Sequence, residues 1–170
     1  MIPDWMTSAP RPFDTVLVAN RGEIAVRVLR AAKESGLRGV AVYSDPDTGS
    51  LHVENADQAV HLPGTTLADT YLNGDAIIEA ARSTGAQAIH PGFGFLSERA
   101  DFANAVKAAG LIWIGPPADA IDTMGDKISA RRCMIESGVP VIPGEEISMG
   151  GDSDHLGVLA AAAARVGYPL

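Results

Sequence analysis

One pattern recurs along this chain: a helical run, a glycine and then an apolar strand. It stands at residues 32–43, 81–90, 107–114, 135–142 and 164–170. A glycine that follows a helix adopts the left-handed conformation that ends the helix and redirects the chain. Strands that alternate with helices in this way form a parallel sheet with helices on both faces. The sequence therefore predicts an α/β fold built on a doubly wound parallel sheet.

The expected strands differ in how clearly they are marked. Residues 15–19, 40–43 and 111–114 are nearly continuous apolar runs, which is typical of strands buried on both faces of a sheet. Residues 88–90 and 139–142 are shorter apolar segments in the same position after a glycine. We expect all five to be strands.

The same pattern suggests how the chain is divided. We expect a mobile tail at 1–12, the doubly wound domain at 13–115, a mostly helical connector at 116–142, and the start of a further domain at 143–170. Domains do not normally end on the first residues of a strand. The chain is therefore expected to be the N-terminal part of a longer protein.

Composition narrows the classes of function. The 170 residues include 13 basic and 21 acidic side chains, so the formal net charge is −8. That charge argues against nucleic acid or an anionic membrane as the main partner. Cys133 is the single cysteine, which is typical of a reducing compartment, and no segment approaches the roughly 20 apolar residues of a membrane span. We expect a cytoplasmic protein, or one in an organelle matrix, with no metal site among its scattered histidines.

The segment Ala88-Ile-His-Pro-Gly-Phe-Gly-Phe-Leu-Ser-Glu98 is the strongest candidate for a binding site. A strand runs into a proline and two glycines, Gly92 and Gly94, and a helix is expected to begin at once. Glycines allow a sharp turn and leave room for a ligand against bare amides. The first turn of a helix also offers unpaired N–H groups to an anion. Open α/β sheets bind their ligands in loops of this kind, at the carboxyl ends of strands.

A helix is predicted at residues 22–35, and its two sides differ in character. Its expected sheet-facing stripe is Ile24, Val28, Ala31 and Ala32. Its opposite side carries Glu23, Arg27, Arg30 and Glu34. Their spacing allows two favourable ion pairs along the helix, each worth a few tenths of a kcal/mol. The residues alone fit a solvated face and a subunit contact equally well.

The loop Ala19-Asn-Arg-Gly22 opens this helix where an NAD-binding Rossmann domain has its three-glycine motif. Only Gly22 is present there, which weighs against an ordinary dinucleotide site in this Rossmann-like fold. The later Gly92-x-Gly94-x-x-Ser97 imitates the motif and leaves a nicotinamide-dependent oxidoreductase as an alternative. That alternative predicts saturable binding of NAD(H).

Three motifs in order resemble the N-terminal region of biotin carboxylase, a component of acetyl-CoA, propionyl-CoA, methylcrotonyl-CoA and pyruvate carboxylases. They are Val18-Ala-Asn-Arg-Gly-Glu-Ile-Ala-Val-Arg27, His90-Pro-Gly-Phe-Gly-Phe-Leu-Ser-Glu98 and Met124-Gly-Asp-Lys127. The resemblance runs from residue 13 to 170 and includes Ile114-Gly-Pro116 and Val139-Pro-Val-Ile-Pro-Gly144. It implies a pre-ATP-grasp domain followed by the start of an ATP-grasp domain.

The resemblance also implies an activity, that of an ATP-dependent ligase. In this family ATP activates bicarbonate as carboxyphosphate, Mg²⁺ accompanies the nucleotide, and biotin on a carrier domain or subunit receives the carboxyl group. A carboxyltransferase then acts on the final acceptor. The family's metal ligands, its bicarbonate-binding basic residues and its flexible lid correspond to sequence beyond Leu170. We therefore expect no catalytic residue within this chain.

Individual roles follow from the matched positions. Lys127 matches the family lysine that contacts ATP, although alone it would be read as a surface charge. The residues that match the border of the biotin and bicarbonate site are Gly92, Phe93, Gly94 and Glu98. Those assigned to a homodimer contact are Arg27, Arg30 and Glu34. Phe93 stands where many members have Tyr, and Arg99 stands where Asn is common.

Two further expectations complete the set. His90 precedes a proline at a strand end, and we expect it to support the loop by hydrogen bonding instead of acting as a base. A standalone, non-catalytic module is the other alternative to the ligase; it would use Arg27, Arg30 and Glu34 to bind a carboxylase subunit. That module predicts a native polypeptide no longer than this chain.

Overall fold

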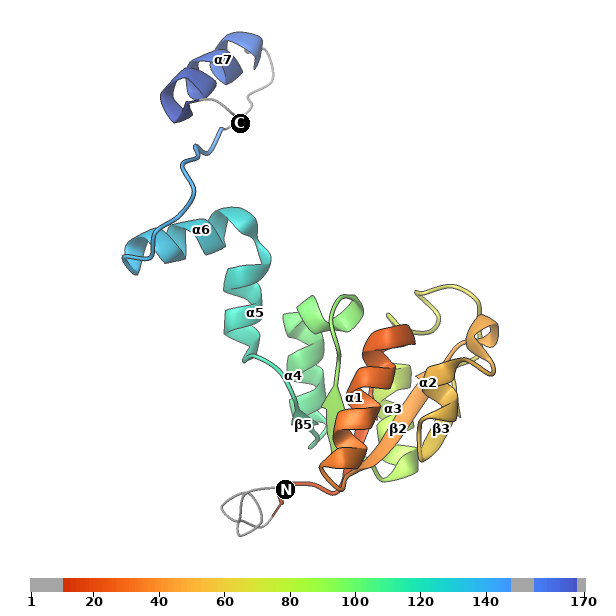
Figure 1. Cartoon of the computed structure of the whole chain (residues 1–170). Helices are drawn as coiled ribbons and strands as arrows, with labels where there is room; N and C mark the ends of the chain where they lie inside the picture. Colours follow the sequence, from red (N-terminus) through yellow and green to blue (C-terminus); the bar gives the residue numbers. More distant parts are fainter. Residues whose placement is uncertain (1–10, 148–154, 168–170) are drawn as a thin grey trace. The chain divides into compact units, whose positions relative to one another are not determined.

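The computed structural model describes residues 11–147 and 155–167 of the chain. The chain forms two compact units, Met1–Asp122 and Thr123–Leu170. Figure 1 shows both units, with labels on many of their helices and strands. The first unit contains the whole sheet.

That sheet has five parallel strands. They are β1 (Thr15–Val18), β2 (Arg38–Tyr43), β3 (Gln58–His61), β4 (Ala88–His90) and β5 (Ile112–Trp113). Their order is β3-β2-β1-β4-β5, and every neighbouring pair is parallel. Successive crossovers leave β1 in opposite directions, so the switch point lies between β1 and β4. This arrangement confirms the predicted doubly wound parallel sheet.

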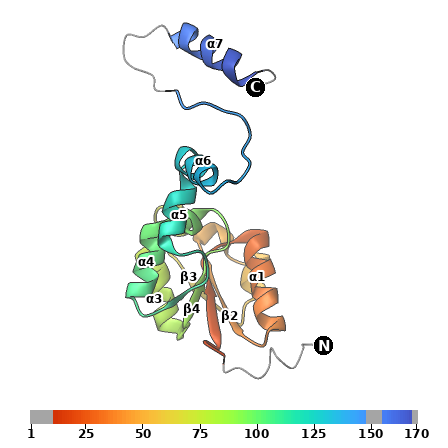
Figure 2. The same ribbon diagram turned by 90° about the vertical axis from the view of Figure 1, so that its left-hand side faces the viewer.

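Helices cover both faces of the sheet, as the view in Figure 2 makes clear. The helix α1 (Gly22–Glu34) covers one face, and α3 (Gly74–Thr84) and α4 (Ala100–Ala108) cover the other. The short α2 (Leu51–Glu54) packs beside α1. Side chains of β1 point alternately to the two faces of the sheet. Val16 and Val18 pack on the α1 side, and Leu17 packs on the other.

The buried stripe of α1 differs from the predicted one. Ala25, Leu29 and Ala32 are buried, whereas Ala31 is exposed and Ile24 is only half-buried. The assignment of Ile24 and Ala31 to the sheet-facing stripe was therefore wrong. The sheet surface opposite is formed by Val18 and Ala41, and the small Ala25 with the branched Leu29 fills the space against it.

One strand had no clear sequence signal. β3 reads Gln-Ala-Val-His, so it is neither a continuous apolar run nor a strict alternation. It pairs only with β2, at the edge of the sheet, and its residues are half-buried or exposed. An edge strand of this kind buries too little surface to impose a hydrophobic pattern.

Three helices follow β5 in the described part of the chain. They are α5 (Ala118–Gly125), α6 (Lys127–Glu136) and α7 (His155–Val166). Ala118 and Ile121 at the start of α5 are buried in the core cluster of the first unit. The predicted boundaries at residues 115 and 142 stay predictions.

The strand expected at residues 139–142 is absent. This stretch has no regular secondary structure, and Val139 and Ile142 are exposed. Pro140 and Pro143 lack the N–H groups that a strand ladder needs, and none of the described strands pairs with this stretch. That expectation was wrong. The strand start expected at 168–170 lies outside the described residues.

Truncation of the α1 stripe should destabilise the fold. We expect Leu29→Ala to lower the free energy of unfolding by about 2–5 kcal/mol, because it leaves a cavity under α1. Leu29 is 2% exposed, whereas Leu51 is 61% exposed. Leu51→Ala is therefore the matched control and should cost less than about 1 kcal/mol. Urea denaturation measures both; a small, equal loss for the two variants would contradict the packing described for α1.

Candidate functional site

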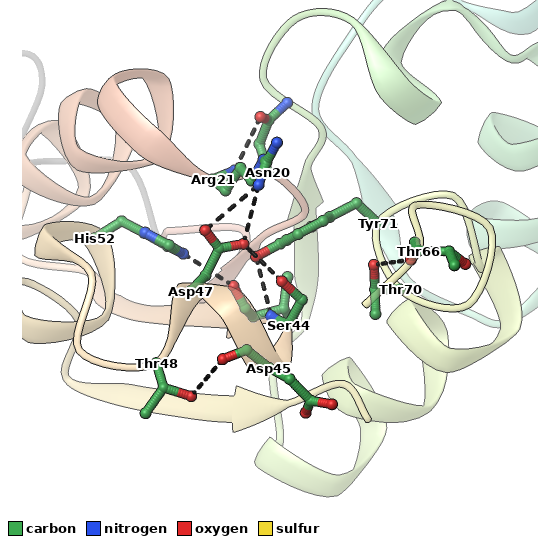
Figure 3. A network of polar contacts seen from close by, with 11 residues as sticks. Asn20, Arg21, Ser44, Asp45, Asp47, Thr48, His52, Thr66, Thr70 and Tyr71 are labelled. Carbon is green, nitrogen blue, oxygen red and sulfur yellow. Dashed lines mark hydrogen bonds and ion pairs between the residues drawn. The ribbon is translucent and has the colours of Figure 1, made fainter. Parts of the chain in front are cut away.

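Three loops meet at the carboxyl edge of the sheet, because the strands that precede them are parallel neighbours. Asn20 and Arg21 follow β1, residues 44–47 follow β2, and the glycine loop 91–94 follows β4. Part of their contact network is drawn in Figure 3. This edge, at the switch point between β1 and β4, is where open α/β sheets bind ligands.

Asn20 connects the first loop to the glycine loop. Its side chain is buried, and Nδ2 donates hydrogen bonds to the carbonyl oxygens of Pro91 at 2.8 Å and Phe93 at 2.9 Å. Its Oδ1 accepts a hydrogen bond from the backbone N–H of Arg21 at 2.9 Å. One amide therefore bridges the crevice between β1 and β4 and holds the glycine loop from beneath.

The two glycines of the loop are required for different reasons. Gly92 has a φ of 70°, and a Cβ at this position would come within 2.7 Å of Asn20 Nδ2. Gly94 has φ 64° and ψ −166°, a combination open essentially to glycine alone. Nothing lies within 4 Å of the position that a Gly94 Cβ would take. Asn20 thus fills the free face of Gly92, whereas the free face of Gly94 is open to a ligand.

The amides of the loop are only partly available. The Gly92 N–H donates to His90 Nδ1 at 3.0 Å. Within the described part of the chain, no acceptor pairs with the N–H of Phe93 or Gly94. The Phe93 side chain beside them is 61% exposed. The expectation of bare amides therefore holds for these two residues and not for Gly92.

The helix expected directly after the glycines begins later. A short 3₁₀ helix, Phe95–Glu98, comes first, and α4 starts at Ala100. Phe95 has a positive φ of 49°, which is strained for a bulky residue, and this turn prevents a direct run into an α-helix. Glu98 is exposed at the end of the 3₁₀ helix.

His90 supports the loop, as predicted. Its Nδ1 accepts the Gly92 N–H, so this nitrogen carries no proton. The ring is half-buried, and burial lowers the pKa of His90 below its usual value. The neutral ring is the form that holds the loop.

A carboxylate, a phenol and a guanidinium form a second contact group at this edge (Figure 3). Tyr71 Oη donates to Asp47 Oδ2 at 2.6 Å, and the N–H of Ser44 donates to the same Oη at 3.1 Å. Ser44 Oγ donates to Asp47 at 2.7 Å, and Arg21 Nη1 lies 3.3 Å from that carboxylate. These contacts compensate for the partial burial of the Asp47 charge.

The pKa values of this group follow from its contacts. Burial alone would raise the pKa of Asp47, but hydrogen bonds from Tyr71, Ser44 and Arg21 outweigh it and lower that pKa. Burial and the hydrogen bond to Asp47 raise the pKa of Tyr71 to about 12. At neutral pH the carboxylate is therefore ionised and the phenol is a neutral donor.

Aromatic contacts extend from this group to the glycine loop. The Arg21 guanidinium carbon lies 5.5 Å from the centre of the Tyr71 ring and 6.0 Å from that of Phe95. The two rings stack with their centres 5.6 Å apart and an interplanar angle of 10°. A positive φ at a bulky residue costs about 1–3 kcal/mol, and these ring contacts offset part of that cost at Phe95.

Lys127 lies in the second unit. It is the first residue of α6 and is exposed. Asp126 caps this helix, since its side chain accepts a hydrogen bond from the N–H of Ser129 at 2.8 Å. Lys127 and the glycine loop belong to different units, so each is described within its own unit.

The residues assigned to a dimer contact are exposed on α1. They are Arg27, Arg30 and Glu34. Arg27 and Arg30 border a depression of about 430 Å³ that also includes Leu51. No ion pair joins Glu23 to Arg27 or Arg30 to Glu34 in the described structure, so this face keeps its charges available. The dimer role stays a prediction.

Neither a metal cluster nor a membrane span occurs in the described ranges. No group of three or more His, Cys, Asp or Glu side chains there is arranged to hold a metal ion. No helix there is long and apolar enough to cross a bilayer.

Sequence reasoning did not single out Arg21, Asp47, Tyr71 or Phe95 as a group. Arg21 lies in the loop after the first strand, and a charged residue in that loop is a detectable signal. Tyr71 lies in a loop without periodicity, 24 residues from Asp47, and no sequence pattern joins the two. Only the fold brings them together.

Comparisons with known proteins identify the family of the chain. Residues 12–121 match the family described as "Biotin carboxylase, N-terminal domain". The chain is 53% identical over 157 residues to the mitochondrial methylcrotonoyl-CoA carboxylase subunit alpha of Oryza sativa subsp. japonica, covering 92% of this chain and 21% of that protein. It is 49% identical over 158 residues to the biotin carboxylase of Haemophilus influenzae, covering 93% and 35%.

A solved structure gives the same result. The biotin carboxylase domain dimer of Hydrogenobacter thermophilus 2-oxoglutarate carboxylase, in complex with MgADP, ADP and bicarbonate, matches with a TM-score of 0.80 and 42% identity. The match covers 94% of this chain and 34% of that one. The chain belongs to the biotin carboxylase N-terminal domain family, and it spans about a third or less of the length of these relatives.

The role of His90 predicts a pH dependence of stability. Because burial lowers the pKa of His90 in the folded state, the unfolded chain takes up a proton first as the pH falls. Neutral His90 therefore contributes its full share to the free energy of unfolding above about pH 6.5. This share is lost as the pH falls from there through the pKa of the folded state, at no more than about 1.4 kcal/mol per pH unit.

We expect His90→Asn to flatten this dependence, since its amide oxygen can replace Nδ1 as the acceptor without titrating. His52 is also buried and its pKa is also lowered by burial, so a residual slope should remain. Urea denaturation between pH 8 and pH 5 measures both proteins. Parallel curves over that range would contradict a neutral, loop-holding His90.

Proposed function

We propose that this chain is the N-terminal part of a biotin carboxylase that uses ATP and bicarbonate to carboxylate biotin on a carrier. The observation that carries the proposal is the glycine loop at the switch point, within a chain of this family. It presents an exposed aromatic ring, two amides that find no acceptor among the described residues, and the open face of Gly94 on one short segment.

These features suit biotin and bicarbonate chemically. The Phe93 ring offers a flat apolar surface for a bicyclic ligand, and backbone N–H groups can donate to a ureido oxygen or to an anion. Phe93 lacks the hydroxyl of the Tyr found in many members, so it would bind by ring contact alone. Glu98 lies one short turn further on and would border the same site.

Lys127 is proposed to bind ATP. It stands exposed at the start of a helix, and nothing lies within 4 Å of the space beside the preceding Gly125, so a phosphate could approach closely. An ammonium at this position provides a point charge for phosphoryl oxygens. When bound, ATP would supply the activated phosphoryl group. The resemblance to the family assigns the Mg²⁺ ligands to sequence beyond Leu170.

The proposed partners follow from the same function. They are a biotin carboxyl carrier domain or subunit, a carboxyltransferase, and a second copy of the chain that contacts Arg27, Arg30 and Glu34. The final acceptor would be an acyl-CoA or pyruvate, and the carboxyltransferase would select it. The single Cys133 favours a reducing compartment such as the cytoplasm.

Substitution of Lys127 tests the proposal in the native protein. We expect Lys127→Ala to raise the KM for ATP roughly tenfold, because one charge-assisted contact to phosphate is lost. Lys107→Ala removes another exposed lysine, from α4, and should leave the KM unchanged. Steady-state ATP cleavage with free biotin and bicarbonate measures both. An unchanged KM in Lys127→Ala would remove the ATP assignment.

A further inference from the structure

We infer that Asn20 is a positioning residue for the biotin-facing loop, and that the Arg21–Tyr71–Phe95 stack completes its support. The inference rests on the proposed function, since it assigns the means by which the chain shapes that site. Asn20 is not placed at the ligand: it lies beneath the loop, 3% exposed.

Asn20 fixes the backbone of the glycine loop. Asn20 Nδ2 donates to the carbonyl groups of both Pro91 and Phe93, the residues on either side of Gly92. With both carbonyl oxygens turned down toward Asn20, the intervening peptide groups are held in one orientation. The N–H of Gly92 is fixed separately by His90. The loop is therefore held at three points around a residue with a left-handed backbone.

The groups of the loop that remain available to a ligand are two backbone N–H groups and the Phe93 ring. The hydrogen bonds to Asn20 and His90 leave the N–H groups of Phe93 and Gly94 without an acceptor in the described ranges. The Phe93 ring is turned out to 61% exposure. A loop that rotated about Gly92 or Gly94 would change the directions of both the ring and the amides. Asn20 therefore controls ligand geometry without ligand contact.

The stack of Arg21, Tyr71 and Phe95 supports the C-terminal end of the glycine loop. Phe95 keeps a positive φ while its ring stacks on Tyr71 and lies under the Arg21 guanidinium. Asp47 holds that guanidinium from the other side. Because Asn20 and Arg21 are consecutive residues, the end of β1 supports both ends of the glycine loop.

The test compares Asn20→Asp and Asn20→Ala with the wild type in the native protein, using free biotin as substrate. The aspartate places a carboxylate oxygen against two carbonyl oxygens, and the alanine removes the donors without repulsion. We expect the KM for biotin to rise about tenfold in each, as two hydrogen bonds are lost, while the KM for ATP stays within about twofold. Asn104→Asp, on the exposed side of α4, is the matched control.

A pH series separates positioning from general loss of structure. When the introduced carboxyl group is protonated it regains one donor, so lowering the pH should return the biotin KM of Asn20→Asp toward the wild-type value. Asn20→Ala should show no such recovery relative to wild type. A rescue limited to the aspartate variant supports a hydrogen bond from this position to the loop.

The possible failures are distinguishable. An active wild type with unchanged biotin KM in both variants overturns the role of Asn20 and leaves the proposed function intact. Equal rises in both KM values together with a lowered Tm indicate a purely structural residue and also overturn it. A wild-type protein whose ATP cleavage does not respond to biotin removes the proposed function itself, and the inference with it.

Discussion

The hydrogen bonds of Asn20 span the crevice at the centre of the sheet, and the geometry of the candidate site depends on them. An open α/β sheet leaves that crevice at its switch point, where ligands commonly enter. In this chain a buried amide occupies it and bonds two carbonyl groups of the loop that follows β4. The proposed ligand-facing surface is then the outer side of that loop, where Phe93 is exposed and the space beside Gly94 is open. The same bonds explain why the site does not resemble a dinucleotide site, in which a glycine face must stay open to a pyrophosphate.

Electrostatics keeps this arrangement in place. A partly buried carboxylate is costly unless it is paired and hydrogen-bonded, and Asp47 satisfies both conditions through Tyr71, Ser44 and Arg21. Its lowered pKa keeps it ionised at neutral pH, so the Arg21 guanidinium stays over the two stacked rings. The strain at Phe95 is thus held by contacts from β1 and β2 as well as by its own loop.

The sequence predicted the parts of the fold that bury much apolar surface. β1 and β2 are buried strands with strong apolar runs, β5 has such a run although it is the edge strand beside β4, and β4 was located by its glycine loop. The edge strand β3 was not predicted, because Gln58 and His61 interrupt the apolar pattern that marks a strand. The stripe on α1 was misplaced because two helical registers were nearly equivalent and only the sheet surface selects Ala25 over Ile24. The expected strand at 139–142 shows the opposite error, since apolar residues alone do not form a strand without a neighbour to pair.

The candidate site could be located from the sequence only where its residues lie in one segment. Gly92, Phe93 and Gly94 form a contiguous motif, so the pattern was visible, and His90 was correctly expected to support it. Asn20 stood in a quoted motif, but its bonds to residues more than 70 positions away follow only from parallel pairing of β1 with β4. No local sequence pattern predicts the hydrogen bond between Tyr71 and Asp47. It forms because the loop before α3 folds over the end of β2.

The most direct test of this account is ATP cleavage by the native polypeptide, isolated with an antibody raised against this chain. ADP release would be measured with bicarbonate, in the presence and absence of free biotin. The account predicts that biotin stimulates ADP release and that the stimulation requires bicarbonate. The account would be contradicted if biotin left the rate of ADP release unchanged. It would also be contradicted if the native polypeptide had a mass of 17.7 kDa and cleaved no ATP.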